Sequence, residues 1–199
     1  MRSKISFAWS VVIISITGVI CSWIIISFPA PSSNDQIVAP IANIIVPKQV
    51  IAELPARLII PAIHINAFIE YVGLTSSGAM AVPQGPNDVA WFDLGPRPGS
   101  SGSAVIAGHE GWKDNIPAVF DSLHQLKAGD LIYIEDQKGA TSTFVVQKTE
   151  IYDQNGNSST VFNSTDGLAH LNLITCEGVW NATEQSYSNR IVVFTDKEN

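Results

Sequence analysis

Two residues that can do nucleophilic chemistry stand at the ends of apolar runs in this sequence. Cys176 closes the run in "LNLITCEG", and His109 closes the run in "SAVIAGHEG". A thiol is mostly protonated at neutral pH, so a cysteine nucleophile needs a base or a cation beside it, and an imidazole can act as either. A glycine lies beside each apolar run and would let a ligand backbone approach closely. The pattern indicates a Cys/His site at one rim of a sheet, although a free cysteine can also simply fill a core.

The sequence also contains a cation that could stabilise the negative charge that develops during acyl transfer. Arg190 is the single arginine after Cys176, and it begins the strand-like run "RIVVFT". The oxyanion formed when a thiolate attacks a carbonyl needs backbone N–H groups or a guanidinium. If one strand ends at Cys176 and the next begins at Arg190, the chain returns to the same rim. His64, His124 and His170 are expected to be surface, packing or turn residues.

The first 30 residues have the pattern of a membrane anchor. Residues 5–30 carry no charge, and as a helix they would span about 39 Å, against a hydrocarbon core of about 30 Å. Arg2 and Lys4 precede this segment, which predicts a cytoplasmic N-terminus and a single-pass protein whose remainder lies outside the cell membrane. A cleaved signal peptide is less favoured, because bulky Phe28 would occupy the −3 position of the cleavage site. Cys21 would lie in the span, so the exported part would hold Cys176 as its one thiol.

The remaining chain divides at its prolines. Residues 31–56 are rich in proline and are expected to form an extended linker, and residues 57–199 are expected to form the catalytic domain. All 18 acidic residues and nine of the 11 lysines and arginines follow the apolar segment, which gives the exported part a formal charge of −9. This charge argues against nucleic acid as a partner.

The domain reads as mainly β. Runs rich in Ile, Val, Phe, Tyr and Thr recur between turns, in "RLIIPAI", "AFIEYVGL", "SAVIAGH", "DLIYIED", "STFVVQKTEIY", "LNLITC" and "RIVVFT". One segment, "PAVFDSLHQL" at 117–126, has helical spacing of its apolar residues. Short strands with one helix predict a closed antiparallel barrel or a sandwich. The acidic turn "EDQKG" at 135–139 is expected to be solvated, so no metal and no cofactor are expected.

These motifs together resemble the sortase family of cysteine transpeptidases. The family resemblance lies in "AGH" after an apolar strand, "LITC" 67 residues later, and an arginine leading "IVVF". The passage "GAMAVPQGPNDVAWFDLGPRPGSSGSAVIAGH" is most similar to class E and F sortases. The resemblance covers about residues 57–195. It implies a sortase barrel of about eight strands, with Cys176 as nucleophile, His109 as acid/base, Arg190 as oxyanion or substrate stabiliser, and Thr175 orienting substrate or lining the oxyanion site.

The same resemblance implies a reaction and its partners. A Leu-Pro-x-Thr-Gly sorting signal at the C-terminus of a surface protein would be cleaved between Thr and Gly. The Thr acyl group would pass from Cys176 to an amine of a peptidoglycan precursor or a pilin lysine. The chain departs from its relatives after the histidine, at Glu110 and Trp112 of "EGWKD", and in "EGVWNATEQSYSN", where Trp180 could contact substrate. These positions concern the acceptor side.

Two other interpretations stay open. One is a different cell-wall acyl transferase or peptidase with a Cys/His/Arg site, such as an L,D-transpeptidase-like enzyme, although those usually hold histidine and cysteine close together in sequence. The other is a catalytically inactive, anchored β-domain that binds wall components and in which Cys176 is buried. A buried thiol resists alkylation in the folded protein, whereas an active one is modified quickly, so the two readings are experimentally distinct.

Overall fold

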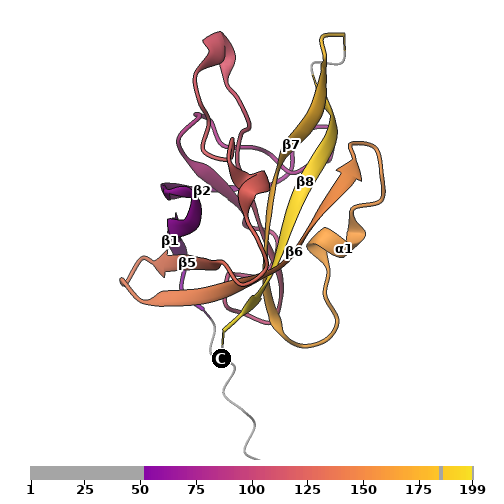
Figure 1. Cartoon of the computed structure of the whole chain (residues 1–199). Coiled ribbons are helices and arrows are strands. Elements are labelled where there is room, and N and C mark those ends of the chain that lie inside the picture. The colour runs from indigo at the N-terminus through magenta and orange to yellow at the C-terminus, as the bar shows by residue number, and fades with distance from the viewer. Residues whose placement is uncertain (1–51, 184–185, 199) are drawn as a thin grey trace, which may run out of the picture. The chain divides into compact units, whose positions relative to one another are not determined.

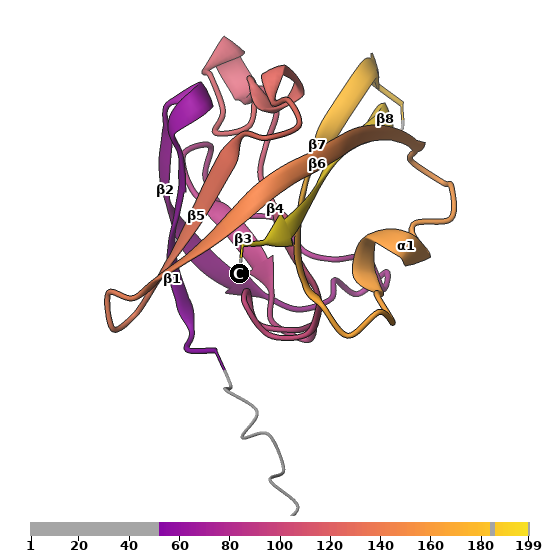
Figure 2. The same cartoon turned by 60° about the horizontal axis from the view of Figure 1, so that its bottom comes forward.

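A computed structural model describes residues 52–183 and 186–198. These residues form an eight-stranded closed barrel in the order β1-β2-β3-β4-β7-β8-β6-β5 (Figures 1 and 2). The strands are β1 (Pro55–Ile60), β2 (Ile65–Val72), β3 (Val89–Phe92), β4 (Gly102–Ala107), β5 (Leu131–Asp136), β6 (Thr141–Asp153), β7 (Ala169–Asn181) and β8 (Ser186–Lys197). One α-helix, α1 (Ser159–Phe162), and three 3-10 turns, η1 (Pro61–Ile63), η2 (Lys113–Asn115) and η3 (Leu123–Gln125), complete the described part. The mainly β barrel with few helices confirms the predicted fold class.

Strand direction is the main departure from the expected antiparallel barrel. β2 pairs with β3 in parallel, and β4 pairs with β7 in parallel, while the other neighbours are antiparallel. Parallel neighbours need a long connection between them, and the segment between β2 and β3 and the chain between β4 and β7 are both long enough. The parallel β4–β7 pair matters for function, because the two strands then run towards the same rim.

The barrel interior is filled by alternating apolar side chains. The side chains that point inward are almost completely buried. They include Leu58, Ile106, Ile132, Phe144, Leu171 and Val193. Trp91 belongs to this core and donates its indole N–H to the Pro96 carbonyl at 3.1 Å. β3, which carries Trp91, was not among the strands that the sequence predicted.

The helix expected at 117–126 is not formed. Only the three-residue turn η3 is helical there, yet Phe120, Leu123 and Leu126 are buried in the barrel core. The Asp121 carboxylate accepts hydrogen bonds from the backbone N–H of Gly111 at 2.6 Å and of Ala118 at 3.1 Å, which holds the segment as a loop. The spacing of the apolar residues therefore correctly indicated which side chains are buried. The backbone conformation of the segment was set by its tertiary contacts instead.

A second apolar cluster lies against the barrel beside the short helix α1. Val105, Val161 and Val192 are its buried members, and side chains such as Phe162 and Ile174 pack against them. Figure 2 shows α1 at the side of the barrel, on the connection from β6 to β7. This cluster forms one wall of the site described below.

The N-terminal predictions fall on residues outside the described part. The expected anchor at 1–30 and most of the linker at 31–56 precede Ala52, and they stay predictions. Between 52 and 198, leaving aside 184–185, no helix is long and apolar enough to cross a membrane. β1 begins at Pro55, two residues before the expected start of the domain, and Leu54 already packs on the core.

Candidate active site

Cys176 and Arg190 face each other across the β7–β8 hairpin. They are register partners in this antiparallel pair. The sequence predicted that one strand ends at Cys176 and the next begins at Arg190, and this was wrong: β7 continues to Asn181 and β8 starts at Ser186. The hairpin therefore extends beyond both residues and rises past the barrel in Figure 1. Direct cross-strand pairing brings the two side chains together more rigidly than two strand ends would.

The hairpin is irregular just beyond the cysteine. The register shifts between Glu177 and Trp180, and Gly178 has a φ of 93°. A Cβ on Gly178 would lie 2.5 Å from the Ser188 hydroxyl oxygen, so only glycine fits. Bulges of this kind bend a strand and re-aim its side chains, and this one lies next to the thiol.

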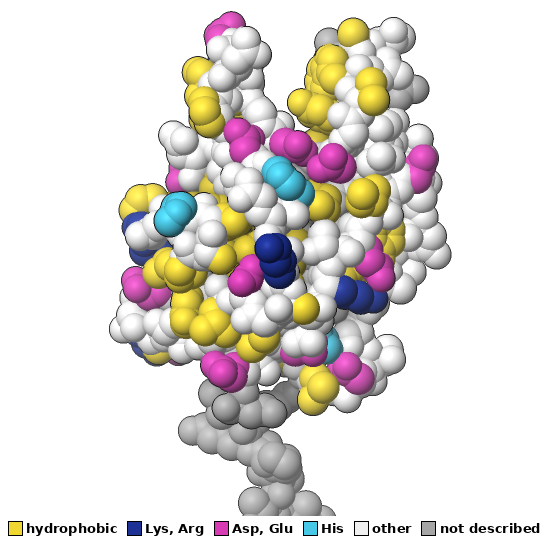
Figure 3. Space-filling view, in the orientation of Figure 1, with side chains coloured by type: hydrophobic (Ala, Val, Ile, Leu, Met, Phe, Trp, Pro, Cys, Tyr) yellow, Lys and Arg dark blue, Asp and Glu magenta, His cyan; other side chains and the backbone are white. Residues whose placement is uncertain are grey.

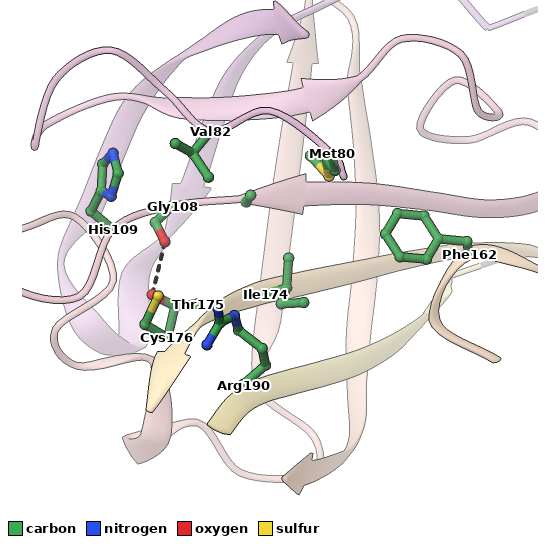
Figure 4. A pocket seen from close by; sticks show the side chains of 10 residues that line it. Met80, Val82, Gly108, His109, Phe162, Ile174, Thr175, Cys176 and Arg190 are labelled. Carbon is green, nitrogen blue, oxygen red and sulfur yellow. Dashed lines mark hydrogen bonds between the residues drawn. The ribbon is translucent and has the colours of Figure 1, made fainter. Parts of the chain in front are cut away.

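Hydrogen bonds fix the Arg190 guanidinium beside the thiol. Nη1 donates to the carbonyls of Tyr187 at 3.0 Å and Asn189 at 2.8 Å, and Nη2 donates to the Ser186 hydroxyl at 3.1 Å. Figure 4 shows the guanidinium directed towards Cys176. A fixed cation at this place can stabilise a thiolate, or the oxyanion that forms when a thiolate attacks a carbonyl.

His109 reaches the same place from the neighbouring strand. β4 ends at Ala107, and the chain stays bonded to β7 through two contacts: the Gly108 N–H donates to the Ile174 carbonyl at 3.1 Å, and the Thr175 hydroxyl donates to the Gly108 carbonyl at 2.8 Å. Gly108 is required because a Cβ there would lie 2.5 Å from the Phe120 ring. Thr175 is 3% exposed, so its hydroxyl ties the histidine strand to the cysteine strand.

The imidazole of His109 points away from the thiol in this structure. Its Nε2 donates to the Pro83 carbonyl at 2.9 Å, since a carbonyl oxygen only accepts. The ring also makes an edge contact with Trp112, with centroids 4.7 Å apart. Figure 4 shows the ring turned towards the segment that carries Val82, with Cys176 on the other side of Gly108. The imidazole is thus held near the site without a bond to the sulfur.

Burial and two opposite charges set the protonation of Cys176. Burial raises the pKa of the thiol, Arg190 opposes this rise, and Glu110 adds to it. The net effect is a raised pKa, so the thiol is protonated at neutral pH. The pKa of the Glu110 carboxyl is itself raised, by burial first and then by the charges of Glu177 and Asp121, while His124 acts in the opposite sense.

The three predicted residues line one apolar pocket. It has a volume of about 120 Å³ and is lined by Met80, Val82, Ala107, Gly108, His109, Phe162, Ile174, Thr175, Cys176 and Arg190 (Figure 4). A wider groove continues from it past α1, between the loops that follow β2 and β6. Met80, Val82, Phe162 and Ile174 were not predicted as site residues, because isolated apolar residues in a sequence carry no sign of which cavity they will face.

The other three histidines do not line this pocket, whereas Trp180 lines a neighbouring groove together with Cys176. His64 and His124 are exposed, and His170 bonds Asp196 at 2.7 Å and Asp166 at 3.0 Å at the start of β7. Trp180 is 51% exposed and stacks edge-on against Tyr187, with centroids 5.2 Å apart, beyond the cysteine on the hairpin. In the part of the chain that the structure describes, no group of three or more His, Cys, Asp or Glu residues could hold a metal ion.

Comparisons with known proteins address the family and the fold of the chain. The Sortase domain family model matches residues 58–198, which is more than half of the chain. Among solved structures, sortase C-1 from Actinomyces oris is 23% identical with a TM-score of 0.56, covering 72% of this chain and 73% of that one. A lid mutant of sortase A from Corynebacterium diphtheriae is 22% identical with a TM-score of 0.57, covering 77% and 74%.

A third solved structure has the same fold, whereas the curated proteins include no match. Sortase C1 from Streptococcus agalactiae is 19% identical with a TM-score of 0.57, covering 72% of this chain and 67% of that one. The likenesses to solved structures show a shared barrel, and the family model covers β7, β8 and the segment after β4, which carry Cys176, Arg190 and His109. The chain therefore belongs to the sortase family, whose members are cysteine transpeptidases.

Proposed function

We propose that this protein is a membrane-anchored transpeptidase that cleaves a Leu-Pro-x-Thr-Gly-like sorting signal between Thr and Gly and transfers the Thr to an amine. The observation that carries the proposal is the pairing of Cys176 with Arg190 across β7 and β8, with His109 at the end of the parallel neighbour β4. These residues supply a nucleophile, a fixed cation and an acid/base group around one pocket.

The first half of the reaction forms a thioester. The Cys176 thiol gives its proton to His109, the sulfur attacks the Thr carbonyl carbon, and the carbonyl electron pair moves onto an oxygen that faces the Arg190 guanidinium. The C–N bond to Gly then breaks, and His109 gives a proton to the departing amine. For this step the imidazole turns from the Pro83 carbonyl towards the pocket.

The second half reverses these roles. The lone pair of an incoming amine attacks the thioester carbon, the C–S bond breaks, and the sulfur keeps the electron pair. His109 takes the proton that the nitrogen releases. Because the pKa of Cys176 is raised by burial, only a small fraction of the enzyme holds thiolate and imidazolium together, and turnover is slow.

The apolar pocket suits the apolar part of such a signal. Met80, Val82, Phe162 and Ile174 offer a surface for Leu and Pro side chains next to the thiol. The donor would be the C-terminal signal of a surface protein, and the acceptor a peptidoglycan precursor or pilin lysine. Class E or F membership, the anchor at residues 1–30 and an extracellular barrel on a cytoplasmic N-terminus are parts of the same proposal, and they rest on the sequence.

The test uses the full-length chain in detergent with an internally quenched Leu-Pro-x-Thr-Gly peptide and excess amine. We expect cleavage with a ligated product. Cys176→Ala should abolish it, His109→Ala should lower the rate about 10²–10⁴-fold, and Arg190→Ala about 10²–10³-fold. Cleavage of a cell-wall tetrapeptide in place of the sorting peptide would favour the other acyl transferase. No turnover, together with a folded-state thiol that resists alkylation, would leave an anchored binding domain.

A further inference from the structure

A second groove opens from the other side of Cys176, and its lining differs from the apolar pocket. Trp112 and Ile116 line it from the loop after β4, Trp180 and Tyr187 line it from the β7–β8 hairpin, and Glu110 and Cys176 also belong to it. Its volume is about 880 Å³. Figure 3 shows two prongs at the top of the molecule, with hydrophobic side chains on the right-hand prong facing the gap and acidic side chains on the surface between the prongs.

Glu110 is the unusual member of this groove. Its Oε2 atom is buried and has no hydrogen-bond partner among the described residues. A buried carboxylate oxygen without a donor is costly, so the site favours a ligand that brings an N–H group. Both oxygens of the nearby Asp121 already accept backbone N–H groups of the loop, so the carboxylate with an unmet need for a donor is Glu110.

The charges around Glu110 favour a cation as that ligand. Asp121 and Glu177 act on Glu110 with negative charge. Of the cations that line the groove, Arg190 is bonded to Tyr187, Asn189 and Ser186, and Lys113 is exposed, where water screens its charge. Trp112, Trp180 and Tyr187 add aromatic faces and edges, and aromatic faces attract ammonium groups.

We propose that this groove receives the acceptor amine as an ammonium ion, and that Glu110 binds it and takes its proton beside Cys176. This inference rests on the proposed transpeptidase function. The sorting signal then enters on the apolar side of Cys176 and the acceptor on the acidic, aromatic side, with the thiol common to both.

The step balances as follows. An N–H proton of the ammonium passes to the Glu110 carboxylate and leaves a neutral amine. The nitrogen lone pair forms the C–N bond to the thioester carbon, the C–S bond breaks, and the sulfur keeps the electron pair. The extra proton on nitrogen passes to His109 and then to the sulfur, and Glu110 returns its proton to water. The products are an amide, the free thiol and one released proton.

The experiment separates this step from acylation. Full-length enzyme is first converted to its thioacyl form with the sorting peptide, which mass spectrometry detects, and is then mixed with one of two nucleophiles. Nα-acetyl-lysine amide carries an ammonium at neutral pH, whereas hydroxylamine is uncharged there. We expect Glu110→Gln to slow aminolysis by the lysine derivative by about tenfold or more, and to change the hydroxylamine reaction less than about twofold.

Two further variants guard the interpretation. Asp114→Asn removes an exposed carboxylate from the same loop without touching the groove, and both reactions should stay at the wild-type rate. Trp180→Ala changes an exposed side chain, so the fold should not be affected. It should slow aminolysis by the lysine derivative more than the reaction with hydroxylamine. Equal losses with both nucleophiles, or no loss with either, would overturn the role of Glu110. Absence of any thioacyl-enzyme in the wild type would overturn the transpeptidase proposal and this inference with it.

Discussion

At the scale of single residues, Cys176 lies between two opposite charges. Arg190 favours its thiolate, whereas Glu110 and burial favour the thiol. The resulting raised pKa protects the thiol from unwanted reaction at neutral pH, because the thiolate is the reactive form. Because of this arrangement, the rate at which the sulfur reacts at a given pH depends on the charges of Arg190 and Glu110.

The pH profile of alkylation tests this balance. Wild-type Cys176 should react with iodoacetamide in a sigmoid whose midpoint lies above the ordinary thiol pKa, since burial is the largest cause of the shift. Arg190→Gln removes the stabilising cation and should move the midpoint to higher pH, and Glu110→Gln removes the opposing carboxylate and should move it to lower pH. Asp114→Asn serves as the control and should leave it unchanged. One midpoint shared by all four proteins would contradict the electrostatic account.

At the scale of elements, the site depends on the parallel pairing of β4 with β7. Cys176 and Arg190 come from an antiparallel hairpin, which a sequence can suggest, but His109 arrives on a strand that is far away in the chain. The bond from the Thr175 hydroxyl to the Gly108 carbonyl joins these strands beside both reactive residues. The placement of His109 near Cys176 therefore rests on the backbone pairing of β4 with β7, and the buried Thr175 hydroxyl adds a bond beside both residues.

Two threonines allow this tie to be tested with a matched control. Thr175→Val and Thr195→Val each remove a buried hydroxyl that donates to a backbone carbonyl, of Gly108 at 2.8 Å and of Leu171 at 2.7 Å. Each should lower the free energy of unfolding by about 1–3 kcal/mol, measured by urea denaturation. Only Thr175→Val should also lower kcat/KM, by about tenfold or more, because it frees the segment that carries His109. Equal activities in the two variants would show that the tie is purely structural.

At the scale of the whole molecule, a charged cluster of His170, Asp166 and Asp196 lies at the start of β7. Burial lowers the pKa of His170, but hydrogen bonds to Asp166 and Asp196 outweigh it, so the pKa is raised overall. The pKa of Asp166 is lowered to about 2, first by the backbone N–H of Leu168 and then by His170. The cluster joins β7 to β8 and to the loop before β7, away from the active site.

These shifts predict how the cluster contributes to stability as pH changes. The raised pKa of His170 gives a contribution that is complete below the unfolded histidine pKa of about 6.5 and is lost as pH rises through the folded value. The lowered pKa of Asp166 gives one that is complete above about 3.8 and is lost as pH falls through about 2. The Tm difference between wild type and His170→Asn should thus be greatest between about pH 4 and 6.5. His64→Asn, at an exposed turn, should show no such window, and a difference that is constant with pH would contradict the assignment.

The sequence alone predicted every described strand except β3, and it singled out the candidate reactive residues. Strand periodicity is local, and Cys176, His109 and Arg190 each stand out because a reactive side chain follows or begins an apolar run. Their combination was specific enough to indicate the family. The expectation of a buried core with few helices rested on the same local patterns, and the structure agrees with it.

Only the tertiary structure decided how these parts meet. The parallel β4–β7 pair, the extension of the hairpin past Cys176 and the loop at 117–126 all depend on partners distant in the chain, which a local pattern does not contain. The rotation of the His109 ring towards Pro83 and the buried oxygen of Glu110 depend on single side chain contacts. The residue types set which chemistry is available here, and long-range packing sets which groups are near enough to perform it, because proximity across a barrel is a property of the closed fold.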